Sequence, residues 1–172
     1  MANTDFNLGA GVKAPRKLLR TYVNVGTDSK EWFLVGSGVE DSAIELNPNT
    51  ETVTDILGVT ETSVTKWEPA QSFDPFTVKG GSKLAFLLHQ IWLDKTPEKL
   101  SQFEVLVVYK YVGEDSAGYD AELQTGCTIN ITSIGGSAYV DMPIEISYSN
   151  NSTKGTVTFD ENVPTFVPNS AA

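Results

Sequence analysis

Cysteine and histidine are almost missing from this chain of 172 residues, which holds only Cys127 and His89. A single cysteine excludes an internal disulfide framework, and a single histidine excludes the usual histidine-rich zinc and iron sites. Apolar runs of about 18 residues, long enough to cross a bilayer as a helix, are absent too. The first residues contain no apolar block of the kind found in secretory signals. We therefore expect a protein that is made in the cytoplasm, with no cofactor, no metal and no membrane span.

Positive charge is also scarce. The chain has 12 basic and 22 acidic residues, a net charge of −10 and a pI near 4.4. Tight binding to phosphates needs Lys and Arg to displace counterions, so the composition excludes a dedicated nucleic-acid-binding protein. The cations are uneven: residues 1–20 carry a net charge of +3 and the remainder −13. This basic arm either stays solvated or docks on an acidic surface of another copy.

No arrangement of residues predicts a catalytic centre. The run Gly80-Gly81-Ser82-Lys83 precedes a helix but lacks the spacing of a phosphate-binding loop. Packing explains the lone His89 and Cys127 better than catalysis does. Carboxylates are numerous enough for a glycosidase-like acid pair, and tryptophans could stack sugars, but no residue is singled out. We predict no catalytic residues and a protein that is not an enzyme.

The hydrophobic pattern predicts strands and one helix. Strands are expected over 21–25, 30–36, 103–112, 119–133, 140–148 and 155–159. The helix is expected over 83–94, where five apolar residues share one face, with Ser82 as its N-cap and Thr96-Pro97 after its end. Residues 40–82 are polar, interrupted by prolines, and expected as a long loop. The chain therefore divides into an arm (1–20), a mainly β domain (21–160) and a second arm (161–172).

The predicted strand over 119–133 has one apolar and one polar side. Alternation places Ala121, Leu123, Cys127, Ile129 and Ile131 together, opposite a row of acidic, amide and hydroxyl side chains. No Lys or Arg occurs from Tyr119 through Asn151. This polar side is either an ordinary solvated face or the border of a water-filled channel. A bend or bulge at Gly126 would shorten the strand.

Segments spread over the whole chain resemble one viral family. They are KAPRKLLRTYVNV, KEWFLVGSGVEDSAIELNPNTET, TDILGVTETSVTKWEP and FDPFTVKGGSKLAFLLHQIW, followed by strands that close on GTVTF. The chain resembles the major tail (tail tube) proteins of bacteriophages with long non-contractile tails, especially those of Gram-positive hosts. A tube subunit of a contractile tail is a close variant. The resemblance implies a β-sandwich or barrel-like tail tube fold with one flanking helix.

The same resemblance implies a function in the virion tail. Hexameric rings would stack into a tube, with four strands of each subunit joined into a continuous inner barrel that conducts double-stranded DNA. The implied partners are further copies of the chain, a tape measure protein, a tail terminator and a distal tail protein. The alternative is a β-sandwich module that binds a carbohydrate or receptor, on a phage tail or a cell surface.

The polar side would then line the bore. Lys or Arg there would hold phosphates, whereas acidic and small polar groups repel them and keep a water layer. The predicted lumen residues are Asp120, Glu122, Gln124, Thr128, Asn130, Thr132, Asp141 and Glu145. Residues 1–20, 40–82 and 161–172 are expected to make contacts between subunits and rings. The arm cations predicted to do so are Lys13, Arg16, Lys17 and Arg20.

Overall fold

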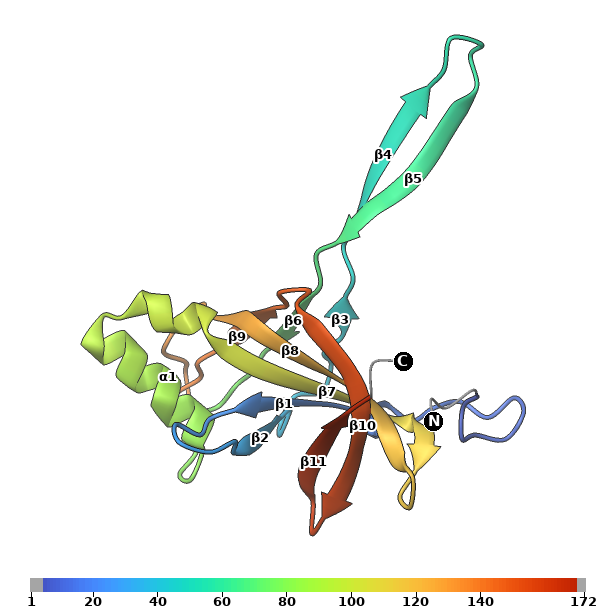
Figure 1. Ribbon diagram of the computed structural model, residues 1–172. Coiled ribbons are helices and arrows are strands. Elements are labelled where there is room, and N and C mark those ends of the chain that lie inside the picture. Colours follow the sequence, from blue (N-terminus) through green and yellow to red (C-terminus); the bar gives the residue numbers. More distant parts are fainter. Residues whose placement is uncertain (1–4, 170–172) are drawn as a thin grey trace.

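The computed structural model describes residues 5–169, and the first four and last three residues of the two expected arms lie outside this range. The described residues form antiparallel strands with one α-helix at one side of them (Figure 1). The strands are β1 (Leu19–Asn24), β2 (Trp32–Val35), β3 (Ile44–Glu45), β4 (Pro48–Thr54), β5 (Thr60–Trp67), β6 (Ala70–Phe73), β7 (Phe103–Glu114), β8 (Gly118–Ile131), β9 (Ile144–Ser147), β10 (Ser152–Asp160) and β11 (Val163–Pro168). The helices are α1 (Lys83–Asp94) and two 3₁₀ turns, η1 (Arg16–Leu18) and η2 (Pro97–Ser101). The mainly β, barrel-like fold with one helix is confirmed.

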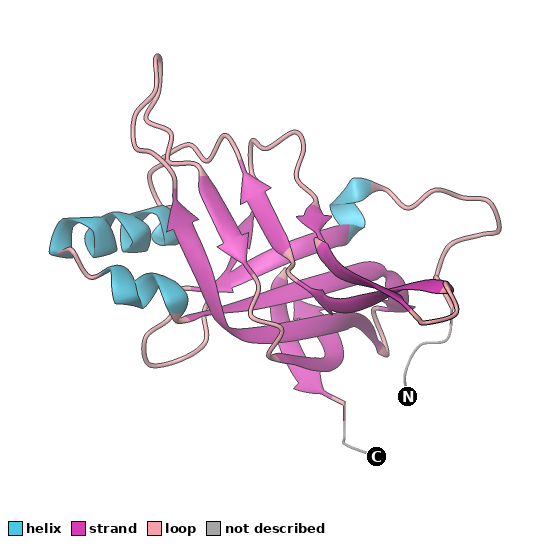
Figure 2. Cartoon of the chain, turned by 90° about the horizontal axis from the view of Figure 1, so that it is seen from above, coloured by secondary structure: helices cyan, strands magenta, loops and turns pink. Residues whose placement is uncertain are grey.

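Helix α1 forms over the residues that the sequence predicts. The Ser82 hydroxyl accepts a hydrogen bond from the Ala85 N–H, and Lys95 ends the helix in the left-handed conformation. Leu84 and Leu88 are fully buried against the strands. Helix α1 and η2 lie together at one end of the strands (Figure 2).

The sheet forks at β8. One branch has the order β2-β1-β7-β8-β10-β11, and the other continues from the second half of β8 through β9 and β6 to β3. Thr125, at the fork, binds the turn between β9 and β10: its N–H donates to the Asn151 carbonyl and its hydroxyl accepts from the Asn151 amide. The two branches fold over one another around the main core.

Side chains rather than a backbone ladder join the branches across their open seam. Strands β1 and β6 are separated by three strands in the sheet order, yet the Thr21 hydroxyl donates to the Gln71 side-chain oxygen at 2.9 Å. The Tyr148 hydroxyl donates to the same oxygen at 2.7 Å, and the Gln71 amide donates to Ser42. Gln71 is 1% exposed. The curled strands thus form a half-barrel that is closed by a buried polar network.

A hydrophobic cluster lies on each side of the first branch. The inner cluster, between the branches and α1, includes Val23, Val105 and Ile146. The outer cluster includes Tyr22, Leu106 and Val157, and β10 and β11 curl over it. Alternate residues of β7 enter the two clusters, so this strand is buried on both sides, as its continuous apolar sequence predicts.

Strand β8 reverses its facing at Gly126. Before this glycine, Ala121 and Leu123 belong to the outer cluster, and after it Cys127 and Ile129 belong to the inner one. Gly126 has φ 72°, and the pairing with β7 shifts register beside it. An extra residue in one strand reverses the alternation that follows. The prediction that one polar side runs along the whole strand is therefore wrong.

Three further segments differ from expectation. Residues 40–82 are not a loop, because they contain β3 and β6 and between them the β4–β5 hairpin, which projects from the body (Figure 1). In the segment expected as a C-terminal arm, β11 pairs with β10. The strand predicted over 140–148 is reduced to β9, which begins directly after Pro143, a residue with no N–H to donate.

Candidate functional site

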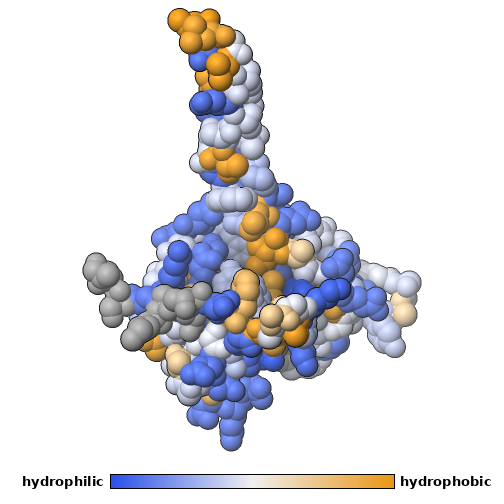
Figure 3. All heavy atoms as spheres, turned by 90° about the vertical axis from the view of Figure 1, so that its right-hand side faces the viewer, coloured by the Kyte–Doolittle hydropathy of each residue, from blue (hydrophilic) through white to orange (hydrophobic). Residues whose placement is uncertain are grey.

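The β4–β5 hairpin ends in a turn that holds two aliphatic side chains out in water. The Asp55 carboxylate accepts from the N–H groups of Leu57 and Val59 at 2.8 and 2.9 Å, and Gly58 takes φ 81°. Ile56 and Leu57 are 102% and 82% exposed. Hydrophobic residues gather at this tip (Figure 3). A well-defined turn that exposes apolar side chains is typical of a contact surface.

The two sides of the hairpin differ in chemistry. On one side threonines pair across the strands, Thr52 with Thr62 and Thr54 with Thr60, each with 3.0 Å between the hydroxyl oxygens. The other side carries Glu51, Val53, Glu61 and Ser63. Every residue of β4 and β5 is exposed. Because an isolated two-stranded hairpin is only marginally stable in water, this one is suited to being held by a partner.

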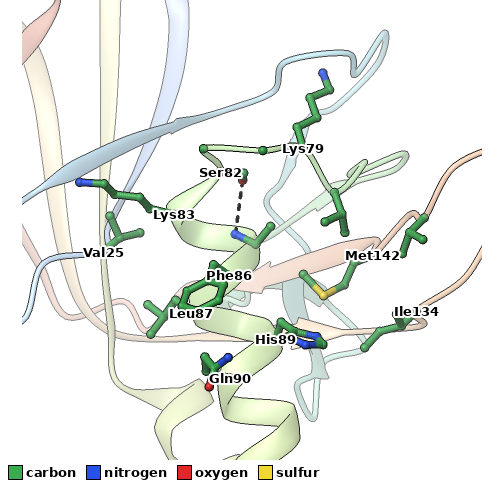
Figure 4. Close-up of a pocket in the computed structure, with 15 residues that line it drawn as sticks. Val25, Lys79, Ser82, Lys83, Phe86, Leu87, His89, Gln90, Ile134 and Met142 are labelled. Atoms are coloured by element: carbon green, nitrogen blue, oxygen red, sulfur yellow. Dashed lines mark hydrogen bonds between the residues drawn. The ribbon is translucent and has the colours of Figure 1, made fainter.

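An apolar pocket of about 730 Å³ lies where α1 begins. In Figure 4, His89 of α1 faces Ile134 and Met142, which come from the chain between β8 and β9. The further apolar lining side chains are Val25, Val78, Ala85, Phe86, Leu87 and Val140. Phe86 is 65% exposed. Sequence reasoning missed this pocket, although Phe86 on the solvent side of α1 was a signal.

The predicted lumen residues before Gly126 lie on the inner side of β8. Glu122 pairs with Val107 and Gln124 with Val105, and both β7 residues belong to the inner cluster. The Tyr109 hydroxyl donates to Glu122 at 3.5 Å; burial, aided by the Glu122 charge, raises the pKa of Tyr109. Asp120 lies opposite Tyr109. Gln124 is only 6% exposed and does not belong to a water-facing surface, which corrects its prediction as a lumen residue.

The predicted residues after Gly126 come together on the outer side of the second branch. Asn130 lies opposite Glu145 on β9, and Ser72 of β6 donates to Glu145 at 3.5 Å. Thr132 and Asp141 lie beyond the ends of these strands, bound to the Pro143 carbonyl and the Thr77 hydroxyl. We call the outer side of this branch the bare polar face. It consists of Glu45, Ala70, Ser72, Thr128, Asn130, Glu145 and Ser147. No Lys or Arg stands in β3, β6, β9 or the second half of β8.

The arm cations divide into two pairs. Arg16 donates twice to the Ser42 carbonyl, at 3.0 and 2.7 Å, and once to that of Leu19. Arg20 lies over the Phe159 ring, 5.9 Å from its centroid. These two arginines are engaged by their own chain. Lys13 and Lys17 are exposed, and a contact with another subunit stays a prediction for them.

Other site chemistries find little support in residues 5–169. No group of three or more potential metal ligands comes together there, and none of the helices in that range is long and apolar enough to cross a bilayer. Burial raises the pKa of the Cys127 thiol. The exposed aromatic side chains of Trp67, Phe86 and Trp92 line three different pockets.

Comparison with known proteins identifies the fold. No protein-family model and no curated protein sequence matches the chain. A chain of the sheath/tube terminator of the PVC extracellular contractile injection system, in its extended state, matches with a TM-score of 0.53 and 10% identity, covering 85% of this chain and 99% of that one. A chain of the sheath–tube complex of the same system matches with a TM-score of 0.51 and 10% identity, covering 86% and 95%. At this identity the likeness shows a shared fold.

Proposed function

We propose that this protein is a structural, non-enzymatic subunit of a phage-type tail tube that assembles as stacked hexameric rings. The observation that carries the proposal is the bare polar face. The branch that bears it contains four strands, the number that the family resemblance implies for each subunit's share of an inner barrel. Edge strand β3 offers unpaired backbone groups, and closing a ring would pair such edges.

The bare polar face suits a bore through which DNA slides. Glu45 and Glu145 carry negative charge and the other polar members are neutral, so the face has no cation to hold a phosphate. Screening limits the repulsion to about 8 Å at physiological salt, so it acts near the wall. Of the predicted lumen residues, Thr128, Asn130 and Glu145 keep this role, and Thr132 and Asp141 lie at a seam between rings. Asp120 and Glu122 line the protein's own inner side.

The proposed location is the tail of a virion. A tape measure protein, a tail terminator and a distal tail protein are the expected partners. The sequence resemblance favours a non-contractile tail, while the two structural neighbours come from a contractile system. The proposal concerns the tube wall and holds for either kind of tail. The alternative of a carbohydrate-binding module would require an aromatic platform, and the exposed Trp67 and Trp92 line different pockets.

Electron microscopy of the purified protein tests this function. We expect negative-stain images to show rings or tubes at high protein concentration. Asn130→Cys, labelled with a maleimide gold cluster before assembly, should place gold inside the bore. Asn162→Cys, in the exposed turn between β10 and β11, is the matched control and should place gold elsewhere. A wild-type protein that stays monomeric at every concentration, or Asn130 gold on the outer wall, would overturn the proposal.

A further inference from the structure

We propose that the β4–β5 hairpin tip, Ile56 and Leu57, inserts into the apolar pocket at the start of α1 in a second copy of this chain. The contact would join copies head to tail, and it rests on the proposed function because it names the contact between successive rings. Three observations carry it: Ile56 and Leu57 are exposed and belong to neither hydrophobic cluster of residues 5–169, the pocket is open and apolar, and the charges around the two are opposite.

The tip cannot be explained by the fold of a single subunit. Ile56 is fully exposed, and the turn holds it in place through hydrogen bonds to Asp55 rather than through packing. Within residues 5–169, strands β4 and β5 pair only with each other, and seven residues at about 3.3 Å each carry the tip roughly 23 Å from the hairpin's base. Side chains so far from the described body of the subunit are placed to meet apolar surface on another molecule.

The pocket offers such a surface. Phe86, Val78 and Val140 line it and are 65%, 46% and 51% exposed, and Met142 forms part of its buried wall. Unbranched methionine adapts its shape to an incoming aliphatic side chain. Burying Ile56 and Leu57 here would cover apolar surface on both copies, which is the main driving force of association.

Charge separates this pairing from unspecific apolar contact. The tip is surrounded by Glu51, Asp55 and Glu61, with no cation between residues 49 and 65. Two lysines, Lys79 and Lys83, line the pocket. Outside the basic arm the chain has only 8 basic residues, and two of these 8 line the pocket in which an acidic tip would dock. Lys83 forms an ion pair with Glu31, and Lys79 donates to Ser37, a neutral hydroxyl, so Lys79 is the better partner for the tip.

Geometry makes the contact directional. The hairpin leads into the first residue of β6, Ala70, whereas Val78 of the pocket comes a few residues after the last residue of β6, Phe73. The tip and the pocket therefore lie toward opposite ends of the molecule (Figure 1). The hairpin tip therefore cannot reach the pocket of its own chain. Contact between two different patches that does not close into a ring continues as a stack.

Cysteine cross-linking tests the contact directly. Native Cys127 is buried, so engineered thiols react with each other. We expect Leu57→Cys mixed with Ile134→Cys, on oxidation, to give a mixed disulfide dimer that neither variant forms alone. Ser63→Cys, on the same hairpin away from the tip, is the matched control and should give none with Ile134→Cys. A mixture of Leu57→Cys and Ile134→Cys that cross-links no better than the control overturns the inference.

Assembly of charge variants gives a second measurement. Leu57→Asp should abolish stacking but leave folding and single rings intact, because Leu57 contacts no core residue, whereas Val64→Asp near the base of the hairpin should still stack. Lys79→Glu should weaken stacking, and adding Glu61→Lys in the same chain should restore it. Normal tubes from Leu57→Asp overturn the inference and leave the proposed function standing, and would point to a different protein as the partner of the tip. Cross-linked head-to-tail strings without rings would support the contact and overturn the proposed function.

Discussion

Replacing Gln71 by leucine should destabilise the protein because two other buried side chains lose their hydrogen-bond acceptor. Gln71 is 1% exposed, and its oxygen accepts from Thr21 and Tyr148, whose side chains are themselves nearly inaccessible to water. Gln71→Leu keeps the bulk of the side chain but leaves two buried hydroxyls without this acceptor. Each such group costs about 1–3 kcal/mol; because the Tyr148 and Thr21 hydroxyls can also hydrogen-bond each other, we expect the free energy of unfolding to fall by about 1–3 kcal/mol and not by the sum of both costs. That is a large fraction of the roughly 5–15 kcal/mol that holds a domain together.

Urea unfolding, followed by tryptophan fluorescence under conditions that prevent assembly, measures this loss. Tyr148→Phe removes only one donor and leaves Gln71 bound to Thr21, so it should cost about 1 kcal/mol. The triple variant Thr21→Val, Gln71→Leu, Tyr148→Phe removes the orphaned hydroxyls and should be more stable than Gln71→Leu alone. If Gln71→Leu unfolds at the wild-type urea concentration, the polar network does not hold the two branches together, and our account of the closed seam is wrong.

Three other predictions concern single positions. Gly126→Ala should lower the free energy of unfolding by about 1–2 kcal/mol, because φ 72° disfavours a Cβ, and Gly126→Asn should lower it less; equal stability of the alanine variant and wild type would contradict the bulge. Leu88→Ala should cost about 2–5 kcal/mol in monomer unfolding, and Ile56→Ala, at the exposed tip, should change it by less than about 0.5 kcal/mol. Cys127, with its pKa raised by burial, stays a protonated thiol at pH 8 and should react with iodoacetamide far more slowly in the folded protein than in urea; equal rates would refute its burial.

The sequence predicts α1 to the residue because its signals are local. An apolar face, the Ser82 cap and the Pro97 that follows all lie within one short segment. The burial of β7 is predicted for the same reason, since its apolar run is continuous. Such signals need no knowledge of the rest of the fold.

The candidate site is harder to predict because it depends on distant segments. Alternation along residues 119–133 suggests one polar side, but the reversal at Gly126 follows from the fork, where one strand pairs with different partners. The β4–β5 hairpin carries threonines and glutamates on exposed strands, so it lacks the apolar alternation that marks a strand packed on a core. The pocket combines Val78, Phe86 and Val140 from three segments, and no spacing within any one of them reveals it.

Because β8 reverses its facing at Gly126, the two halves of this strand should accept different substitutions among homologues. In the first half, polar positions such as Gln124 look toward the packed interior, so natural variants there should keep side-chain size and charge almost unchanged. In the second half, Thr128 and Asn130 face outward, so exchanges among hydroxyl, amide and carboxyl side chains should be accepted there. Lys and Arg should be avoided at these positions if the surface contacts the phosphates of DNA. The positive φ of Gly126 separates the two halves. Homologues should therefore retain glycine or asparagine at this position even where the sequences of both halves of β8 have diverged.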